Sequence, residues 1–245
     1  MKKIISLILV IVMAAALIGC GGAGGGKLTI ATSPDFPPFE YLEGGKVVGI
    51  EIEILEKVAA KLGKELVVEQ MDFDSVIPGV QAGKFNVGVS GITVTEERKQ
   101  NMDFSDVYFM ASQAIVVMPD SPITCKADLE GKKISVQTGT TAEVYCMENG
   151  YEVSAFSANN DAASALTIGK VDAWVVDNEV AVVLAEQMGL TVLDEAMTAE
   201  PYAFAFKKGA DAEMVAAFNA VIAEMIADGS MQALFDKYGA VYVSP

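Results

Sequence analysis

Histidine is absent from this 245-residue chain, and arginine, tryptophan and cysteine are rare. Without histidine there is no Ser–His catalytic pair and no histidine-ligated zinc site, and the commonest general acid–base group is missing. The three cysteines are too few for an ordinary thiolate zinc site, because the first belongs to an N-terminal signal described below. We therefore expect neither a metal nor any other cofactor.

Positive charge is also scarce, since 17 lysine and arginine residues face 33 aspartate and glutamate residues and give a net charge of −16. A chain this acidic repels the phosphate backbone, which excludes nucleic acid as a partner. It repels anionic lipid as well, so attachment to a membrane would need a lipid anchor rather than a basic patch.

The first twenty residues, MKKIISLILVIVMAAALIGC, are typical of a secretion signal. Two lysines precede an apolar run, 4–18, that is too short for an ordinary transmembrane helix of ~20 residues. The end of the signal, LIGC, resembles the bacterial lipoprotein signal, in which the cysteine is lipidated. We expect residues 1–19 to be removed, Cys20 to carry the lipid, and the protein to be extracytoplasmic and anchored to the cell membrane.

The glycine-rich segment GGAGGGK, residues 21–27, nearly matches a phosphate-binding loop. Leu28 stands where the magnesium-binding Ser or Thr belongs, and no strand precedes the glycines, so we reject that interpretation. Residues 20–26 are instead expected to form a flexible tether that holds the globular part close to the membrane.

Strand-like and helix-like segments alternate from Lys27 onward, and the alternation restarts after Pro119. This pattern predicts an α/β architecture with two lobes. The expected division is 27–107 with 204–245 for lobe 1, 113–198 for lobe 2, and 108–112 with 199–203 for a two-strand hinge.

An internal repeat supports two similar lobes. The segments VQAGKFNVGVSG (80–91) and LTIGKVDAWVVD (166–177) share a helix end, a Gly-Lys turn and an apolar strand. Their strands end at Gly91 and Asp177, and ligands of open α/β sheets bind outside the carboxyl ends of strands. These two strand ends are therefore the first candidates for a binding site.

The only arginine, Arg98, lies in the first turn of a helix that Thr95 is expected to cap. A cation there opposes the helix dipole, so helix stability does not explain it. A guanidinium offers a planar fork that binds a carboxylate or phosphate through two hydrogen bonds. Gly91 and Thr93 precede it at the same strand end, with a close-approaching backbone and a hydroxyl.

A second anion site is predicted where VQTGTTAE, residues 136–143, passes from a strand into a helix at Thr140 or Thr141. Asp177 ends an apolar strand and needs a cation beside it. An α-amino acid supplies both charges. The simpler alternatives are that Asp177 and Thr140 only cap their helices, and that Arg98 is a surface charge.

Several segments carry a resemblance to a known family: LTIATSPDFPPFEY, VVGIEIEILEKVAAKLG, MDFDSVIPGVQAGKFNVGVSGITVTEERKQNMDFSD, DLEGKKISVQTGTTAE and GKVDAWVVD. From Lys27 to Gly239 the chain resembles the bacterial family 3 solute-binding proteins that deliver polar amino acids to ABC importers. The resemblance implies a two-lobed, type II periplasmic-binding-protein-like fold. Each lobe would be a mostly parallel sheet flanked by helices, and the protein would be a monomer that meets the importer's permease subunits.

The resemblance also implies a ligand site. The ligand's carboxylate would meet Arg98 and the N–H groups of Thr93 and Thr141. Its ammonium would meet the Gly91 carbonyl, the Thr93 hydroxyl and the Asp177 carboxylate. The side-chain pocket would be formed by Ser33, Phe36, Phe73, Gln137 and Val176.

Specificity is predicted from departures from the family pattern. Members that bind cationic amino acids often carry an acid where this chain has Ser33, while Gln137 is neutral and Val176 apolar. A neutral or polar ligand such as glutamine is therefore expected, with aliphatic amino acids and cystine as open alternatives. Asp35 and Glu40 lie nearby in sequence and leave a weak cationic preference open.

Two other functions fit the same fold, namely an enzyme similar to cyclohexadienyl dehydratase and a ligand-sensing module for a receptor. We favour the binding protein, because an enzyme without histidine would need Glu, Asp or Lys as its general acid.

The remaining cysteines, Cys125 and Cys146, precede a predicted strand and end the helix after it. Both would then lie at the sheet end away from the cleft. Outside the cytosol such a pair is expected to form a disulfide.

Overall fold

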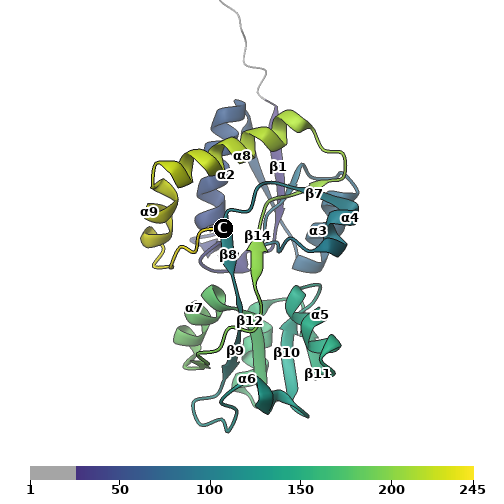
Figure 1. Cartoon of the computed structure of the whole chain (residues 1–245), viewed down its shortest axis with the longest axis vertical. Helices are drawn as coiled ribbons and strands as arrows, with labels where there is room; N and C mark the ends of the chain where they lie inside the picture. The colour runs from purple at the N-terminus through teal and green to yellow at the C-terminus, as the bar shows by residue number, and fades with distance from the viewer. Residues whose placement is uncertain (1–25) are drawn as a thin grey trace, which may run out of the picture.

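The computed structural model describes residues 26–245, so the expected signal peptide, the lipidation site at Cys20 and most of the tether lie outside the described residues. The described chain forms two α/β lobes that lie one above the other and are joined by extended chain (Figure 1). The two-lobed α/β fold expected from the sequence is confirmed.

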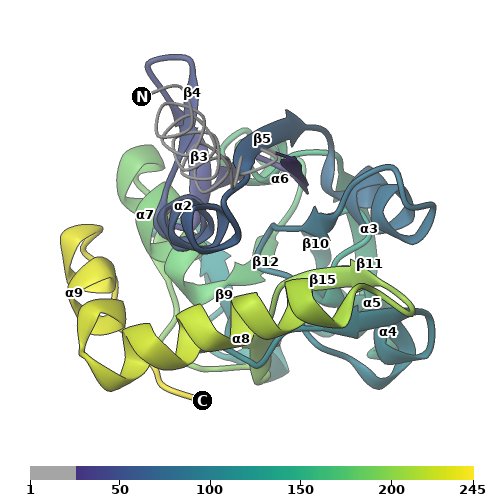
Figure 2. The ribbon, with the colours of Figure 1, turned by 90° about the horizontal axis from the view of Figure 1, so that it is seen from above.

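The first lobe is built on a sheet whose central strands are buried, as their apolar sequences predict. In spatial order its strands are β5 (Glu65–Gln70), β1 (Lys27–Thr32), β6 (Val87–Gly88), β15 (Ala205–Lys207) and β7 (Met102–Phe104). Its helices are α2 (Ile50–Leu62), α3 (Phe73–Gln81), α4 (Glu96–Asn101), α8 (Ala212–Ala227) and α9 (Ser230–Lys237). Figure 2 shows α8 passing across this lobe beside α2, with α9 beyond it.

A small antiparallel sheet is attached to the same lobe. Its strands are β2 (Asp35–Phe36), β3 (Glu40–Glu43) and β4 (Lys46–Val48), and β4 leads directly into α2. Through this connection the sheet places the start of α2 next to the loop that follows β1.

The second lobe repeats the arrangement. In spatial order its strands are β11 (Glu152–Phe156), β10 (Lys133–Gln137), β12 (Ala173–Asp177), β9 (Gln113–Val117) and β13 (Thr191–Val192). Its helices are α5 (Thr141–Glu148), α6 (Asn159–Thr167) and α7 (Asn178–Met188), with a short 3₁₀ helix, η2 (Lys126–Leu129). The predicted internal repeat is present, because β6 lies beside β1 and β12 beside β10, both in parallel.

The expectation of mostly parallel sheets needs correction. Each five-stranded sheet contains two parallel and two antiparallel pairings. The antiparallel pairings involve β15 and β9, the strands by which the chain returns to one lobe and enters the other. A strand that arrives from the other lobe runs opposite to the strands of the local β–α–β units, so it pairs antiparallel.

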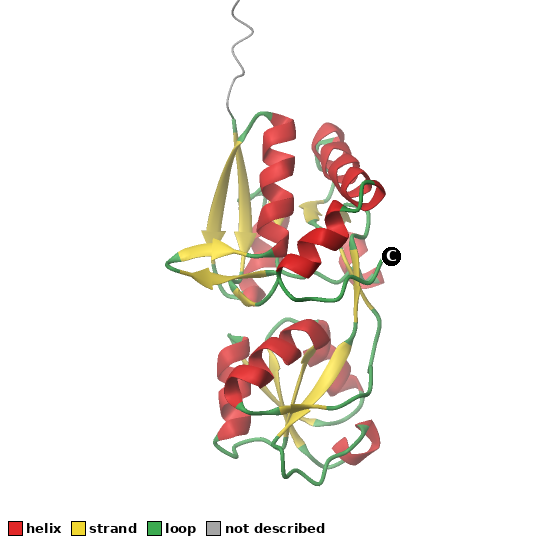
Figure 3. Cartoon of the chain, turned by 90° about the vertical axis from the view of Figure 1, so that its left-hand side faces the viewer, coloured by secondary structure: helices red, strands yellow, loops and turns green. Residues whose placement is uncertain are grey.

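Two extended segments cross between the lobes, along one side of the molecule (Figure 3). They are β8 (Phe109–Ala111) and β14 (Glu200–Tyr202), which pair antiparallel with each other. The rings of Phe109 and Tyr202 lie 5.8 Å apart between centroids, and Phe39 lies 5.3 Å from Tyr202. Aromatic packing therefore fixes the crossing strands against the first lobe.

Among residues 26–245, no single helix is both long and apolar enough to cross a membrane. Only α8 and α9 taken together have that length and composition, and they are bent by 83° where they meet.

The two cysteines of the second lobe are free thiols, which corrects the expected disulfide. Cys146 is fully buried against the apolar face of the sheet, among residues such as Val136. Cys125 lies at the start of η2 with its sulfur 3.6 Å from an Asp128 carboxylate oxygen. The sequence placed both cysteines in the correct elements, but their side chains point to different surroundings.

A thiol-labelling experiment tests this correction. We expect Cys146 to resist alkylation in the folded protein at neutral pH, because burial raises the pKa of its thiol to about 12 and leaves almost no thiolate. Both Cys125 and Cys146 should be alkylated after unfolding in denaturant without reductant, as peptide mass spectrometry would detect. A peptide pair that stays linked until reductant is added would contradict the structure.

Candidate functional site

The candidate site lies between the lobes, where four strand ends meet the crossing strands. In the first lobe the carboxyl ends of β1 and β6 face the gap between the lobes. In the second lobe the carboxyl ends of β10 and β12 face it. In open α/β sheets this edge is where ligands bind, because parallel strands place their carboxyl ends together.

Arg98 comes from α4, and Thr95 caps that helix as predicted, since its hydroxyl oxygen accepts a hydrogen bond from the Arg98 backbone N–H at 3.1 Å. The guanidinium donates from Nη1 to the Thr93 carbonyl at 2.9 Å and from Nη2 to the Gly139 carbonyl of the second lobe at 3.3 Å. It also lies 5.9 Å from the centre of the Phe73 ring, within cation–π range. Arg98 is therefore a half-buried cation that touches both lobes.

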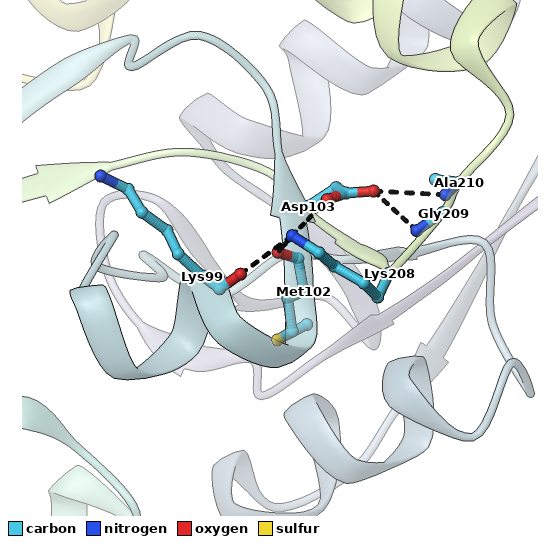
Figure 4. Close-up of polar contacts among 6 residues, drawn as sticks. All are labelled: Lys99, Met102, Asp103, Lys208, Gly209 and Ala210. Carbon is cyan, nitrogen blue, oxygen red and sulfur yellow. Dashed lines mark hydrogen bonds and ion pairs between the residues drawn. The ribbon is translucent and has the colours of Figure 1, made fainter.

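The short helix that carries Arg98 is held at its far end by Lys208 (Figure 4). The Lys208 ammonium donates to the carbonyls of Lys99 at 3.0 Å and Met102 at 3.3 Å. It also pairs with the Asp103 carboxylate at 2.9 Å, whose other oxygen accepts the Gly209 N–H at 2.7 Å. A cation at the carboxyl end of a helix is favourable, so this cluster fixes the orientation of α4.

Asp177 is buried at the end of β12 and accepts a hydrogen bond from the Tyr202 hydroxyl of β14. Although it occupies the N-cap position of α7, its side chain makes no capping hydrogen bond. Burial raises the pKa of Asp177 well above its usual range, and the nearby Glu200 charge raises it further, while the Arg98 charge lowers it. The carboxyl group thus points toward the same space as the guanidinium.

The electrostatics of Arg98 agree with that placement. Burial lowers the pKa of its guanidinium, and the carboxylates of Glu200, Asp177 and Glu97 oppose the shift. Arginine stays charged in any case, because its pKa starts above 12. Arg98 from the first lobe and Asp177 from the second therefore border one gap as a guanidinium and a carboxyl group of raised pKa.

Glu200 is a central residue that the sequence analysis missed. Its side chain is buried, and Oε2 accepts the Thr93 hydroxyl of the first lobe at 2.7 Å and the Thr141 hydroxyl of the second lobe at 2.9 Å. Oε1 accepts the Thr198 hydroxyl at 2.6 Å. A carboxylate within the apolar stretch EPYAFAF was the only sequence signal available. It connects the crossing strand to both lobes.

We expect Glu200→Gln to weaken ligand binding about tenfold, because the amide leaves a single acceptor oxygen for the hydroxyls of Thr93, Thr141 and Thr198, and an unmet buried donor costs ~1–3 kcal/mol. Titration calorimetry or fluorescence would measure this. Asp194→Asn, in the exposed loop before β14, provides the matched control and should bind normally. Equal binding by Glu200→Gln and Asp194→Asn would show that the Glu200 charge does not organise the site.

The predicted pocket residues Ser33 and Gln137 meet at Asp35. The Ser33 hydroxyl donates to Asp35 Oδ1 at 2.9 Å, and Gln137 Nε2 donates to Oδ2 at 3.2 Å. Oδ2 also accepts the backbone N–H of Asn159 at 2.6 Å, at the start of α6. Burial raises the pKa of Asp35, and these hydrogen bonds counteract the shift. Asp35 therefore joins the first lobe to the second at this end of the site.

Two of the predicted aromatic residues line the first lobe. Phe36 packs so closely on Gly91 that a Cβ added there would lie 2.4 Å from its ring. Gly91 has φ +51°, a conformation that favours glycine, so this position excludes side chains for two reasons. Phe73 lies under the Arg98 guanidinium. Both rings are almost fully buried.

Val176 is not brought to these polar groups. It is buried in the same core cluster as Trp174, whereas Val175 packs in a separate cluster on the other side of the sheet. Side chains alternate along a strand, so Val176 and Asp177 leave β12 in opposite directions. The predicted role of Val176 in the pocket therefore has no support from its packing.

Cavities open at both ends of the candidate site. One of about 410 Å³ is bordered by Arg98, Gly139, Thr141 and Glu200. Another of about 480 Å³ is bordered by Asp35 and Tyr41 of the first lobe and by Asn160 and Leu184 of the second. In residues 26–245 no cluster of three or more His, Cys, Asp or Glu side chains has the arrangement of a metal site.

Two α/β lobes, joined by paired crossing strands and presenting opposite charges to the gap between them, define a bilobal ligand-binding protein. Residues 28–241 match the bacterial extracellular solute-binding proteins, family 3, and the chain belongs to that family. The arginine-binding extracellular protein ArtP of Bacillus subtilis (strain 168) is 32% identical over 252 residues, covering 97% of this chain and 98% of ArtP.

Solved structures show the same similarity. An ancestral arginine-binding protein bound to glutamine superposes with a TM-score of 0.82 at 39% identity, covering 87% of this chain and 97% of that one. The ancestral amino acid-binding protein AncCDT-1, described as a precursor of cyclohexadienyl dehydratase, has a TM-score of 0.80 at 33% identity, covering 87% and 95%. These relatives are named as binding proteins, and the last is also described as the ancestor of an enzyme.

Proposed function

We propose that the protein captures one free α-amino acid between its lobes. The observation that carries the proposal is that each lobe brings a complementary group to one gap. Arg98 of the first lobe bonds Thr93 and, in the second lobe, Gly139, and Asp177 of the second lobe bonds Tyr202 of the crossing strand. The ligand's carboxylate would bind Arg98 and the N–H groups of Thr93 and Thr141. Its ammonium would bind the Gly91 carbonyl, the Thr93 hydroxyl and Asp177.

Closure of the lobes would be the binding event. Arg98 already donates to Gly139, and Glu200 accepts from Thr141, so contacts between the lobes are available on the Arg98 side of the site. A ligand that bridges the lobes binds the closed conformation more tightly than the open one. This difference in affinity shifts the population toward the closed conformation. An amino acid of about ten heavy atoms at ~1 kcal/mol per atom reaches micromolar or tighter affinity.

The ligand's side chain is proposed to be neutral or polar, with glutamine as the first choice. Ser33 and Gln137 can hydrogen-bond an amide, and Phe36 with Phe73 supplies apolar walls. The structure of a relative bound to glutamine supports this choice.

A cationic amino acid is the second candidate, because Asp35 places a carboxyl group beside Ser33 and Gln137. The relative named as arginine-binding supports it. Asp35 is already hydrogen-bonded by Asn159, so a cationic side chain would have to compete with that contact or share it.

Delivery to the permease of an ABC importer is part of the proposal, and membership of the solute-binding family supports it. The expected lipid at Cys20 would hold the protein outside the cytoplasm, on the membrane that contains the importer. The binding proteins among the relatives favour this role over catalysis, and a test for product from prephenate or arogenate would expose an enzyme.

A thermal-shift screen against the twenty standard amino acids and cystine tests the proposal, because a ligand that binds only the folded state raises the melting temperature. Calorimetry would then rank the positive ligands. Glutamine among the strongest would support the first candidate, and arginine or lysine the second. If no amino acid stabilises the protein, the proposed function fails.

A further inference from the structure

Two carboxyl groups outside the proposed ligand contacts are fully buried in the first lobe. Glu40 is the first residue of β3, and Glu51 lies in the first turn of α2. Both lie behind the loop of Ser90 and Gly91, which follows β6. Burying two acids without a cation is costly, so the arrangement needs an explanation.

Glu51 has a hydrogen-bond donor at each oxygen. Its Oε1 accepts the Tyr108 hydroxyl at 2.5 Å, and its Oε2 accepts the Gly91 backbone N–H at 3.2 Å. Both contacts need an acceptor and neither needs a proton on Glu51, so they suit a carboxylate. Its position at the amino end of α2 also favours a negative charge. Glu51 is therefore the ionised member of the pair.

Glu40 has the opposite pattern. Its Oε1 accepts the Ser90 hydroxyl at 2.9 Å, but its buried Oε2 receives no hydrogen bond from any described residue. Glu40 and Glu51 bond the adjacent residues Ser90 and Gly91, so both carboxyl groups lie against one loop, and the charge of Glu51 acts to raise the pKa of Glu40. Two ionised carboxylates buried so close to one loop would repel each other, whereas a proton on Glu40 Oε2 removes one charge and gives the unpartnered oxygen a hydrogen to donate. One shared proton thus explains the unpartnered oxygen.

Within residues 26–245 neither Glu40 nor Glu51 forms an ion pair with a lysine or arginine. Burial, and then the charge of Glu51, raise the pKa of Glu40 well above its usual range, and Asp35 contributes in the same direction. Tyr108 faces the pair from the segment that leads into β8, and burial raises the pKa of its hydroxyl, so it remains a neutral donor. Ser90 is the other polar side chain in contact with Glu40.

The pair contacts the elements that would hold the ligand. Through Gly91 N–H and the Ser90 hydroxyl it fixes the strand-end loop, and through Tyr108 it reaches the start of a crossing strand. Among the described residues nothing donates a hydrogen bond to the Gly91 carbonyl, which follows the anchored N–H directly along the chain. The anchored loop thus leaves that acceptor available.

We propose that Glu40 and Glu51 share one proton and act as positioning residues, holding the Ser90–Gly91 loop so that the Gly91 carbonyl receives the ligand's ammonium. This proposal rests on the proposed function. The single negative charge of the pair lies behind the loop and adds to the attraction for that ammonium.

Two isosteric substitutions distinguish this arrangement from simple core packing. Glu40→Gln keeps an acceptor toward Ser90 and a donor toward Glu51, so affinity for the best amino acid should stay within about twofold of wild type. Glu51→Gln removes the charge and turns one acceptor toward Gly91 or Tyr108 into a donor, so affinity should fall about tenfold or more. Glu56→Gln, on the exposed side of α2, is the matched control and should bind normally.

The pH dependence of stability gives a second readout. A carboxyl group whose folded-state pKa is raised contributes stability that is complete below its unfolded value of 4.5 and is lost as pH rises through the folded value. The melting temperature of the wild-type protein should therefore fall as pH rises from 4.5 toward the alkaline range. Glu40→Gln cannot lose that proton, so its profile should be flatter and its melting temperature higher than wild type at the alkaline end.

The results for the two variants distinguish the shared proton from simple core packing. Equal losses of affinity in Glu40→Gln and Glu51→Gln, or a wild-type pH profile in Glu40→Gln, would overturn the shared proton. If Glu51→Gln does not fold, the affinity and pH profile of Glu40→Gln still decide. If wild-type protein binds no amino acid, the proposed function fails, while the melting profiles of wild type and Glu40→Gln still test the proton.

Discussion

Arg98→Lys is expected to weaken amino-acid binding by ~2 kcal/mol or more, about 30-fold. The guanidinium donates to Thr93 and Gly139 from two different nitrogens, so it can hold both lobes while its remaining N–H groups are available to a carboxylate. An ammonium is a point donor and cannot replace that geometry. Titration calorimetry with the ligand identified by the thermal screen would measure the loss.

Lys99→Ala is the control for this substitution, because Lys99 is the next residue of α4 and its exposed ammonium bonds only Glu96. It should bind like wild type. Wild-type affinity in Arg98→Lys would show that the arginine provides charge without oriented hydrogen bonds, and it would remove the main reason for placing the carboxylate there.

Asp177→Asn is expected to have a still larger effect, about 100-fold, because removing one partner of a buried charge pair leaves the other without compensation at ~2–5 kcal/mol. The asparagine has the same shape and can still accept from Tyr202, so the fold should persist. Calorimetry would give the affinity, and the melting temperature without ligand would confirm that the variant is folded.

Because Asp177 can gain or lose a proton, we expect ligand affinity to depend on pH. Burial raises the pKa of Asp177 when no ligand is present, whereas a bound ammonium would favour the ionised form. Binding would then release a proton, and affinity should rise as pH increases from the usual aspartate value, 3.8, through the raised one. Asp177→Asn should lack this rise.

Glu186→Gln is the control, since Glu186 is an exposed glutamate on the same helix, α7. It should retain affinity and the pH dependence. If Asp177→Asn binds as tightly as Glu186→Gln, the ammonium does not meet Asp177.

The local parts of the site were predictable because their signals lie within a few residues. The Thr95 cap, the helix that follows it and the strand that ends at Asp177 can all be recognised from neighbouring side chains. Arg98 stood out because a cation in a first helical turn, in a chain with no other arginine, has no local explanation.

The residues that were missed depend on distant parts of the chain. Glu200 bonds Thr93 and Thr141, which are 107 and 59 positions away, and no periodic pattern brings such residues together. The antiparallel pairing of β15 with β6 also depends on the chain returning from the second lobe. The other site residues were predicted from the resemblance to the family. The same resemblance predicted Val176 as a pocket residue, but Val176 packs in the core cluster with Trp174.

Side-chain direction was a further limit. Cys125 and Cys146 were assigned to the correct elements, yet one lies at a helix start beside Asp128 and the other in the core. Element boundaries fix a residue's position along the backbone, while the disulfide needed the two side chains to face each other.

The polar cluster at Asp35 and the network at Glu200 share no hydrogen bond within the described chain. In the proposed function the Glu200 network serves the invariant half of an amino acid, and no hydrogen bond ties it to the cluster that serves the variable half. Descendants of such a protein could exchange Ser33, Asp35 or Gln137 and acquire a new nutrient while the machinery for the common backbone stays intact. Modularity of this kind makes a scaffold easy to diversify, one position at a time.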